Sequence, residues 1–377
     1  MRFPRAGRFW LAVFLMALLI VGCLITVTVI TLGYRQVSNL VEVISLIRSE
    51  YLHEVNPSRL VEGAAKGMVE ALDDPYSVYL EPGTFKHLQE QIRGSFGGLG
   101  ILVGMKNERL TVIKPFPGTP AGRAGLRAGD VIVKIGERRT EGLDLETAVG
   151  LMRGPVGTRV TLTLMRPGSG PLTLTLEREE INVPTVEEKL FPGGIGYLAI
   201  TQFTEHTPTE VQRLLGELRA KGMRALILDL RDNPGGELQA AVRVADYFVP
   251  AGPVVYVDYR NDNDEVLSAS GSRLGLPLLV LVNENSASAA EIVAAAIKET
   301  RSGKVVGTRT FGKGVVQSVY PLKNGAGLKL TTARYLTPRK HDINRKGVEP
   351  DVKVEQPASG EDRQLAVAKE LLRRSLR

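Results

Sequence analysis

Ser288 lies in a run of small residues whose pattern could present a reactive hydroxyl. The stretch Asn283–Glu299, NENSASAAEIVAAAIKE, follows the short apolar run Leu276–Val282, which has the length and branching of a buried strand. Ser288 and Glu291 have the spacing of a capping box, and the alanines after them favour a helix. A strand-to-helix turn is also where serine nucleophiles are found. Ser288 is therefore either a helix cap or a nucleophile.

A serine nucleophile needs a base, and Lys313 is a candidate. It lies in the glycine-flanked turn TFGKG and precedes the alternating segment VVQSVY, which predicts a strand with Lys313, Val315 and Gln317 on one face. A lysine can accept a proton once burial lowers its pKa from about 10.4. The neutral amide of Gln317 could orient Lys313 without raising that pKa. His206 is the alternative base, and a solvated side chain is the alternative role of Lys313.

A second turn with chemical potential is Asp232–Gly236, DNPGG, which follows the apolar run RALILDLR and leads into a predicted helix. The N–H groups at a helix N-terminus favour negative charge, although an ordinary strand-to-helix turn explains the glycines equally well. From Val183 onward, strands alternate with helices, which predicts a largely parallel sheet covered on both faces. Sites in such folds lie beyond the carboxyl ends of the strands, where both turns should be.

Residues Gly307–Lys313 fit the GxxxxGK pattern of a phosphate-binding loop. The match fails at Gly314, where a serine or threonine should bind magnesium. It fails again because a strand rather than a helix is predicted to follow. Nucleotide binding is therefore the weaker interpretation of this segment.

The composition is that of a globular protein with room for two or three domains in its 377 residues, of which 43% are hydrophobic. The net charge of +7 is spread along the chain, which gives no case for nucleic-acid binding. The single cysteine, Cys23, excludes an internal disulfide and a site built from several cysteines.

An apolar segment, Phe9–Leu32, follows Arg2, Arg5 and Arg8 and is long enough to span a bilayer. We expect a single-pass anchor in the cell membrane, with the bulk of the chain extracytoplasmic. A cleaved signal peptide and a lipoprotein signal, suggested by the residues Ile20–Cys23, are the alternatives.

Residues 94–180 contain short alternating strands with glycine and proline turns, after a helical region over residues 34–93. Gly98-Leu99-Gly100-Ile101, followed by PGTPAGRAGLRAGDVIVKIG, resembles a PDZ domain. The resemblance implies that Leu99, Gly100 and Ile101 form a loop that binds the terminal carboxylate of a peptide, which adds to the sheet as a strand.

The whole arrangement, with DLRDNPGG, NENSASAAEIVAAAIKE, GTRTFGKGVVQ and a closing KGVEPDV, resembles the carboxyl-terminal processing peptidases, also called tail-specific proteases. The resemblance implies a multidomain α/β (α+β) protein with a crotonase/ClpP-like peptidase core. It assigns Ser288 as nucleophile, Lys313 as base and Gln317 as its support. An oxyanion hole would come from Ala289 with Gly235 or Gly236.

The predicted organisation is a cytoplasmic stub and anchor, a helical region, a PDZ domain, a peptidase core and a C-terminal tail, over residues 1–33, 34–93, 94–180, 181–355 and 356–377. The resemblance implies a serine endopeptidase that acts on proteins bound by their C-termini, with no cofactor or metal, and makes a homodimer plausible. The alternative is a catalytically inert PDZ scaffold that only binds protein tails.

Overall fold

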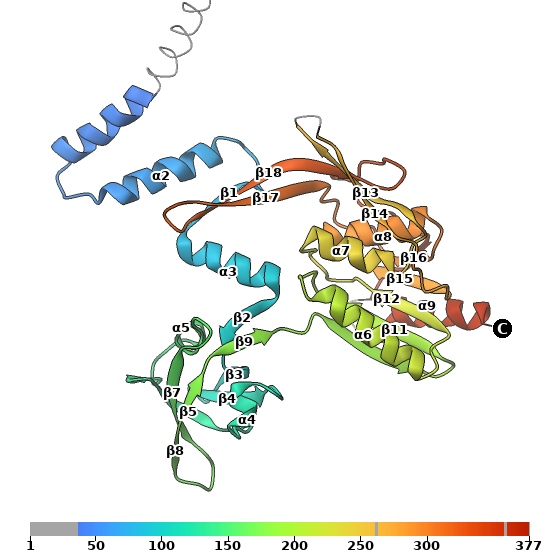
Figure 1. The fold of residues 1–377 in the computed structure, drawn as a ribbon, viewed down its shortest axis with the longest axis horizontal. Coiled ribbons are helices and arrows are strands. Elements are labelled where there is room, and N and C mark those ends of the chain that lie inside the picture. Colours follow the sequence, from blue (N-terminus) through green and yellow to red (C-terminus); the bar gives the residue numbers. More distant parts are fainter. Residues whose placement is uncertain (1–36, 261–262, 358–359, 377) are drawn as a thin grey trace, which may run out of the picture. The chain divides into compact units, whose positions relative to one another are not determined.

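The computed structural model describes residues 37–260, 263–357 and 360–376 (Figure 1). The chain divides into two compact units after Tyr79. The first holds a helix over residues 37–50 and α2 (Pro57–Glu70), which begins at the proline that the sequence places between two helical segments. The predicted anchor, Phe9–Leu32, lies outside the described residues. Within them, no helix combines the length and apolarity that crossing a membrane requires.

Strand β1 (Val78–Leu80) spans the division, and α3 (Pro82–Arg93) leads into a small module built mainly of strands. The main sheet of this module has the order β3-β4-β5-β7-β8, with β6 paired to β5. The elements in chain order are β2 (Ser95–Gly98), β3 (Ile101–Lys106), β4 (Arg109–Pro115), α4 (Pro120–Arg123), β5 (Val131–Ile135), β6 (Arg138–Arg139), α5 (Leu145–Met152), β7 (Arg159–Met165), β8 (Pro171–Glu177) and β9 (Glu179–Asn182).

Alternation along β7 shows how this module forms its core. Val160, Leu162 and Leu164 are buried, as every second residue of a strand with one face on a core should be. Strands β2 and β9 pair antiparallel beside the main sheet, with Ser95 opposite Asn182. The chain therefore enters and leaves the module along two adjacent strands.

The rest of the second unit is a larger α/β core. Its six-stranded sheet has the order β10-β11-β12-β15-β16-β19, in which β10 is antiparallel to β11 and the other pairs are parallel. The core elements are β10 (Val186–Phe191), β11 (Ile195–Ile200), α6 (Thr207–Ala220), β12 (Ala225–Asp229), α7 (Leu238–Asp246), β13 (Gly252–Tyr259), β14 (Glu265–Ala269), β15 (Leu278–Val282), α8 (Ala289–Glu299), β16 (Lys304–Gly307), β17 (Val315–Pro321), β18 (Gly327–Leu336), β19 (Val352–Lys353) and α9 (Arg363–Ser375).

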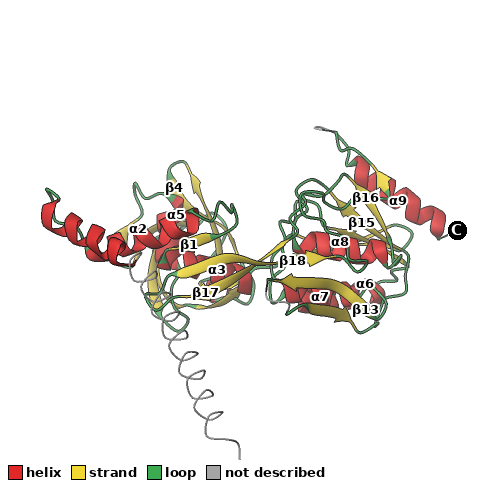
Figure 2. Cartoon of the chain, turned by 90° about the horizontal axis from the view of Figure 1, so that it is seen from above, coloured by secondary structure: helices red, strands yellow, loops and turns green. Residues whose placement is uncertain are grey.

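Helices cover both faces of this sheet (Figure 2). Helices α6, α7 and α8 pack on one face, and α9 packs on the other through Ala368 and Leu372. Every residue of β12 and β15 is buried, because successive side chains point to opposite faces and both faces are covered. The predicted parallel, doubly covered sheet is confirmed.

A second antiparallel layer carries one wall of the site described below. Strand β18 pairs with β17 on one side and with β13 on the other, and β13 also pairs with β14. Because β17 begins two residues after Lys313, this layer fixes the position of the lysine turn relative to α8.

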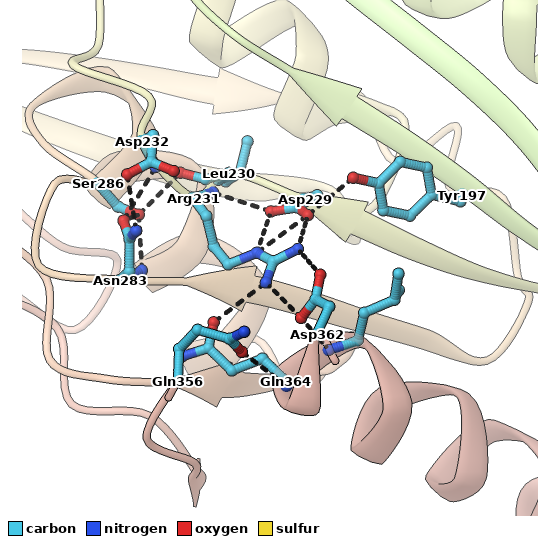
Figure 3. A network of polar contacts seen from close by, with 11 residues as sticks. Tyr197, Asp229, Leu230, Arg231, Asp232, Asn283, Ser286, Gln356, Asp362 and Gln364 are labelled. Carbon is cyan, nitrogen blue, oxygen red and sulfur yellow. Dashed lines mark hydrogen bonds and ion pairs between the residues drawn. The ribbon is translucent and has the colours of Figure 1, made fainter. Parts of the chain in front are cut away.

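An arginine at the end of β12 fastens helix α9 to the sheet (Figure 3). The guanidinium of Arg231 donates to the Asp229 carboxylate at 2.6 Å and to the Asp362 carboxylate at 2.8 Å. Asp362 is also the N-cap of α9 and accepts the Leu365 N–H at 3.0 Å. Burial alone would raise the pKa of Asp362, but the hydrogen bonds from Arg231 and Leu365 lower it below its ordinary value.

We expect Asp362→Asn to destabilise the protein by about 0.5–1.5 kcal/mol at neutral pH, a range reduced because the carboxylate is partly exposed. Asparagine keeps the cap but loses the charge-assisted bonds to Arg231. Because the folded pKa is lowered, the contribution is present above the unfolded pKa of about 3.9 and is lost as the pH falls through the folded pKa. Urea unfolding across this range measures it, with Glu361→Gln as control. Identical curves for Asp362→Asn and the wild type at pH 7 would contradict the assignment.

Candidate active site

The two turns predicted to carry chemistry meet at the carboxyl ends of the adjacent strands β12 and β15. The Asp232 carboxylate accepts hydrogen bonds from the side-chain amides of Asn283 at 2.9 Å and Asn285 at 2.8 Å. The buried Ser286 hydroxyl donates to the Leu230 carbonyl at 2.7 Å (Figure 3). Ser286, the first serine of the SAS motif, therefore ties one turn to the other.

Asn233 and Gly235 set the spacing between the turns. The Asn233 side chain is buried, donates to the Ile200 carbonyl and accepts the Gly235 N–H at 2.8 Å, while its own carbonyl accepts the Ala287 N–H at 2.9 Å. Gly235 has a φ of 100°, and a Cβ there would lie 2.8 Å from the Ser288 Cβ. Only glycine fits so close to the serine.

Ser288 is the N-cap of α8 and has a backbone conformation unusual for a residue with a side chain, at φ 55° and ψ −117°. Its N–H donates to the Glu291 carboxylate at 2.9 Å, which is the half of the predicted capping box that Glu291 supplies. Its hydroxyl accepts a hydrogen bond from the Tyr335 hydroxyl at 3.0 Å. Strained turns of this kind occur where a nucleophile is held exposed at the end of a strand. The cap and the accessible hydroxyl are therefore compatible.

The fully buried carboxylate of Glu291 joins the serine turn to the lysine turn. One oxygen accepts the backbone N–H groups of Ser288 at 2.9 Å and Lys313 at 2.8 Å. The other accepts the Gly312 N–H at 2.7 Å and the Thr310 hydroxyl at 2.5 Å. Four donors from two separate segments thus compensate the cost of burying one carboxylate.

Ser288 and Lys313 line the same cavity, whose volume is about 360 Å³. Gln317 and Tyr335 also line it, together with a largely apolar wall formed by Leu88, Ile92, Leu238, Ile292, Val315, Val316 and Val319. Leu88 and Ile92 belong to α3, the helix that leads into the small module. The cavity therefore has a few polar groups beside surfaces suited to apolar side chains.

Lys313 is half-buried, and burial is the main cause that lowers the pKa of its ammonium group. The positive charge of Lys329, which also lines the cavity, lowers the pKa further, whereas the Glu291 carboxylate opposes the shift. A lowered pKa increases the fraction of neutral lysine, which is the form that can accept a proton.

Lys313, Val315 and Gln317 all line the cavity, as the predicted alternation along β17 requires. The β17–β18 register shifts between Val316 and Gln317, and both Val315 and Val316 line the cavity. The extra residue of this bulge lies in β18, because Val316 pairs with Ala333 and Gln317 with Thr331, which leaves Thr332 between them. The Gln317 amide donates to the Val315 carbonyl at 3.3 Å. Its support of Lys313 stays a prediction.

The two glycines of DNPGG have different environments. Gly235 is buried and its N–H donates to Asn233, whereas Gly236 is exposed and lines the cavity. Among the described residues, no acceptor receives the N–H of Gly236 or of Ala289. The Glu237 side chain caps the start of α7. This geometry favours Gly236 with Ala289 as the pair available to a developing negative charge.

In the small module, Leu99 is buried and Gly100 has a φ of 71°, with its carbonyl accepting the Phe116 N–H at 2.9 Å. A Cβ on Gly100 would lie 2.3 Å from the Thr119 Cβ. Ile101 begins β3, which runs beside α5. The loop therefore turns sharply between β2 and β3, and no described residue accepts the N–H groups of Leu99 and Gly100.

Two alternatives from the sequence are not supported by this arrangement. His206 is the N-cap of α6 and is not among the residues that line the cavity. Strand β17, and not a helix, follows Lys313, which rules out a phosphate-binding loop over Gly307–Lys313. Within the described ranges, acidic, histidine and cysteine side chains form no group of three that could hold a metal ion.

A serine at a strained strand-to-helix turn, in one cavity with a half-buried lysine, is the type of site found in serine hydrolases. Comparison with known families agrees. Residues 194–354 match peptidase family S41, residues 112–166 match the PDZ domain, and residues 28–84 match the N-terminal domain of the activating protease CtpB.

Similar proteins extend the match over most of the chain. The carboxy-terminal processing protease CtpA of Bacillus subtilis (strain 168) is 39% identical over 313 residues, which cover 82% of this chain and 67% of the relative. The carboxy-terminal-processing protease of Bartonella bacilliformis is 39% identical over 334 residues, covering 86% and 76%. The solved photosystem II D1 C-terminal processing protease is 34% identical, covers 82% of this chain and 85% of its own, and has a TM-score of 0.50. The chain belongs to the carboxy-terminal processing proteases of family S41, which are serine peptidases.

The environment of Lys313 yields a prediction about pH. Replacing Lys329 with glutamine removes a positive neighbour, so the pKa of Lys313 should rise. If neutral Lys313 is the base, the rising limb of the pH–activity profile moves to higher pH, with activity lost at neutral pH and recovered on the alkaline side. Lys329→Arg keeps the charge and should leave the rising limb of the profile at the same pH. The matched control is Lys323→Gln, which removes the charge of an exposed lysine between β17 and β18. A limb that moves to lower pH in Lys329→Gln would exclude this role.

Proposed function

We propose that this protein is a membrane-anchored, extracytoplasmic endopeptidase that cleaves with Ser288 and Lys313 and recognises substrate proteins by their C-termini. The observation that carries the proposal is the shared cavity. A conformationally strained serine and a lysine whose pKa is lowered by burial both line it. A lysine with no role beyond solubility would not need a lowered pKa, and a serine that only capped a helix would not need a strained backbone.

In the proposed reaction, the Ser288 proton passes to neutral Lys313 while Oγ forms a bond to the substrate carbonyl carbon. The carbonyl π electrons move to the oxygen, which receives hydrogen bonds from the N–H groups of Gly236 and Ala289. When the carbonyl re-forms, the carbon–nitrogen bond breaks and the amine takes the proton from Lys313. Water, deprotonated by Lys313, then hydrolyses the acyl-enzyme in the same way.

The cavity wall suggests which residue precedes the bond that is cut. Ile292, Val315 and Leu238 offer apolar contact beside Ser288. Burying a small or medium apolar side chain there gives about 0.8 kcal/mol for each methylene group. We infer a preference for apolar residues at that position and not for charged ones.

The PDZ module supplies the proposed specificity for protein tails. The turn at Leu99 and Gly100 presents backbone N–H groups that a terminal carboxylate can accept, and Ile101 begins a strand to which an extended peptide can pair. The proposed anchor would hold the enzyme beside membrane or secreted substrates. Exposed apolar side chains on the helices of the first unit, including Val41, Leu46 and Val61, are compatible with a homodimer.

The nucleophile and the base are tested by a pair of substitutions. Ser288→Ala should abolish cleavage of an unstructured protein while the fold survives, since losing a helix cap costs about 0.5–2 kcal/mol against a stability of about 5–15 kcal/mol. Lys313→Arg should be as inactive as Lys313→Ala, because arginine keeps the charge but does not deprotonate. Gel-based cleavage and thermal unfolding measure both properties. Full activity of Ser288→Ala would favour an inert scaffold that only binds tails.

Recognition of C-termini is tested by changing the substrate and leaving the enzyme intact. Amidating the C-terminus of a peptide removes one charge-assisted interaction with the Leu99–Ile101 loop and leaves the other contacts in place. We expect a roughly 10- to 100-fold rise in KM for the amidated peptide, which corresponds to losing one hydrogen bond to a charged group. A peptide that ends in aspartate should also bind weakly. Equal KM values for the three peptides would show that the module does not select tails.

A further inference from the structure

Tyr335 is a residue of the cavity that none of the sequence motifs contains. It belongs to β18, its side chain is 3% exposed, and its hydroxyl donates to the Ser288 Oγ at 3.0 Å. The ring is part of the main apolar core cluster, which also includes Ala289 and Ile292 of α8. The hydroxyl is therefore held at the reacting atom by a packed ring.

The backbone of Tyr335 is fastened to the other half of the site. Its N–H donates to the carbonyl of Gly314, the residue after Lys313, at 3.1 Å, and the neighbouring pair Arg334 and Val315 continues the β17–β18 ladder. One residue thus contacts the serine through its side chain and the lysine turn through its main chain. A change in the lysine turn would move the tyrosine hydroxyl with it.

The direction of this hydrogen bond constrains the serine proton. A serine hydroxyl has one proton and two acceptor sites. Because Tyr335 donates to Oγ, one acceptor site is filled and the Ser288 proton must point elsewhere in the cavity, where Lys313 is the proposed acceptor. We propose that Tyr335 is a further catalytic residue, whose hydroxyl stabilises the Ser288 oxygen as it gives up its proton. This inference rests on the proposed function of Ser288.

The contribution differs between stages of the reaction. As the Oγ–H bond breaks and the proton moves to Lys313, negative charge grows on Oγ, and a hydrogen bond to a charged oxygen is about twice as strong as one to a neutral oxygen. Once Oγ has bonded to the carbonyl carbon, that charge has moved to the oxyanion and the bond from Tyr335 weakens again. Tyr335 keeps its own proton throughout. An interaction that is strongest in the transition state raises kcat.

The test compares Tyr335→Phe with the wild type, using the full chain in detergent micelles. The substitution removes only the hydroxyl and keeps the packed ring. Tyr256→Phe is the matched control. Tyr256 is half-buried on β13 and pairs with Leu336, the residue that follows Tyr335. Its ring lies under the Lys340 ammonium group. Two rates are measured: cleavage of an unstructured protein, and labelling of Ser288 by a fluorophosphonate, which reports the nucleophile without requiring protonation of an amine.

We expect Tyr335→Phe to lower kcat and the labelling rate together, by about 10- to 100-fold, with KM little changed and Tyr256→Phe equal to the wild type. A Tyr335→Phe protein as reactive as the wild type, or more reactive, would overturn the proposal. The more reactive result would indicate that the tyrosine restrains the serine. Slower cleavage with unchanged labelling would also overturn it, because the hydroxyl would then act on the substrate.

A second substitution covers the case in which Tyr335→Phe folds poorly. Replacing Tyr335 with 3,5-difluorotyrosine keeps the ring and hydroxyl but lets the phenol ionise at lower pH, where it stops donating. Activity and labelling should then decline at a lower alkaline pH than in the wild type. The neighbouring titratable groups, Lys313, Lys329, Glu237 and Glu291, are the same in both proteins. An unchanged alkaline limb would count against the proposal.

Failure of the proposed function can be told apart from failure of this inference. If the wild-type protein neither cleaves the substrate nor is labelled by the fluorophosphonate, both the proposed function and the role of Tyr335 are wrong. If the wild type is labelled, Ser288→Ala is not, and Tyr335→Phe reacts as fast as the wild type, then only the proposed role of Tyr335 is wrong.

Discussion

The buried carboxylate of Glu291 is the interaction on which the geometry of the site depends. A charged group without solvent access is tolerable only when donors surround it, and those donors come from the serine turn and from the segment Thr310–Lys313. Its place in the first turn of α8 adds the favourable end of the helix dipole. Because an unpaired buried charge is so costly, the serine turn and the segment Thr310–Lys313 are held in one fixed arrangement around Glu291.

The local structure of the site could be predicted from short stretches of sequence. The apolar run before Asn283, the capping spacing of Ser288 and Glu291, and the alanines of α8 encode a strand, a turn and a helix, and the structure has all three. The pattern by itself predicts either a cap or a nucleophile at Ser288. The two were compatible because Glu291 secures the backbone of the turn while the Ser288 hydroxyl faces the cavity.

Other features depend on contacts between distant residues, which periodicity does not encode. The bulge in β18 opposite Val316 and Gln317 follows from the pairing of β17 with β18, and the approach of Tyr335 to Ser288 follows from the packing of Tyr335 against α8. The difference between Gly235 and Gly236 follows from one buried asparagine side chain. A lone tyrosine in an alternating strand gives no sign of its role, since such residues ordinarily fill a core.

The paired strands β2 and β9 make the small module an excursion from a chain that otherwise continues from α3 into the core. In the topology of the core, the whole segment between Gly98 and Glu179 takes the place of a loop, and the pairing of β2 with β9 holds its two ends together. Closing such a loop costs entropy that grows only with the logarithm of its length, by about 0.6 kcal/mol for each doubling. The thermodynamic burden of carrying a whole recognition domain at this position is therefore small. Lineages could lengthen, shorten or exchange the inserted domain with little effect on the stability of the peptidase fold.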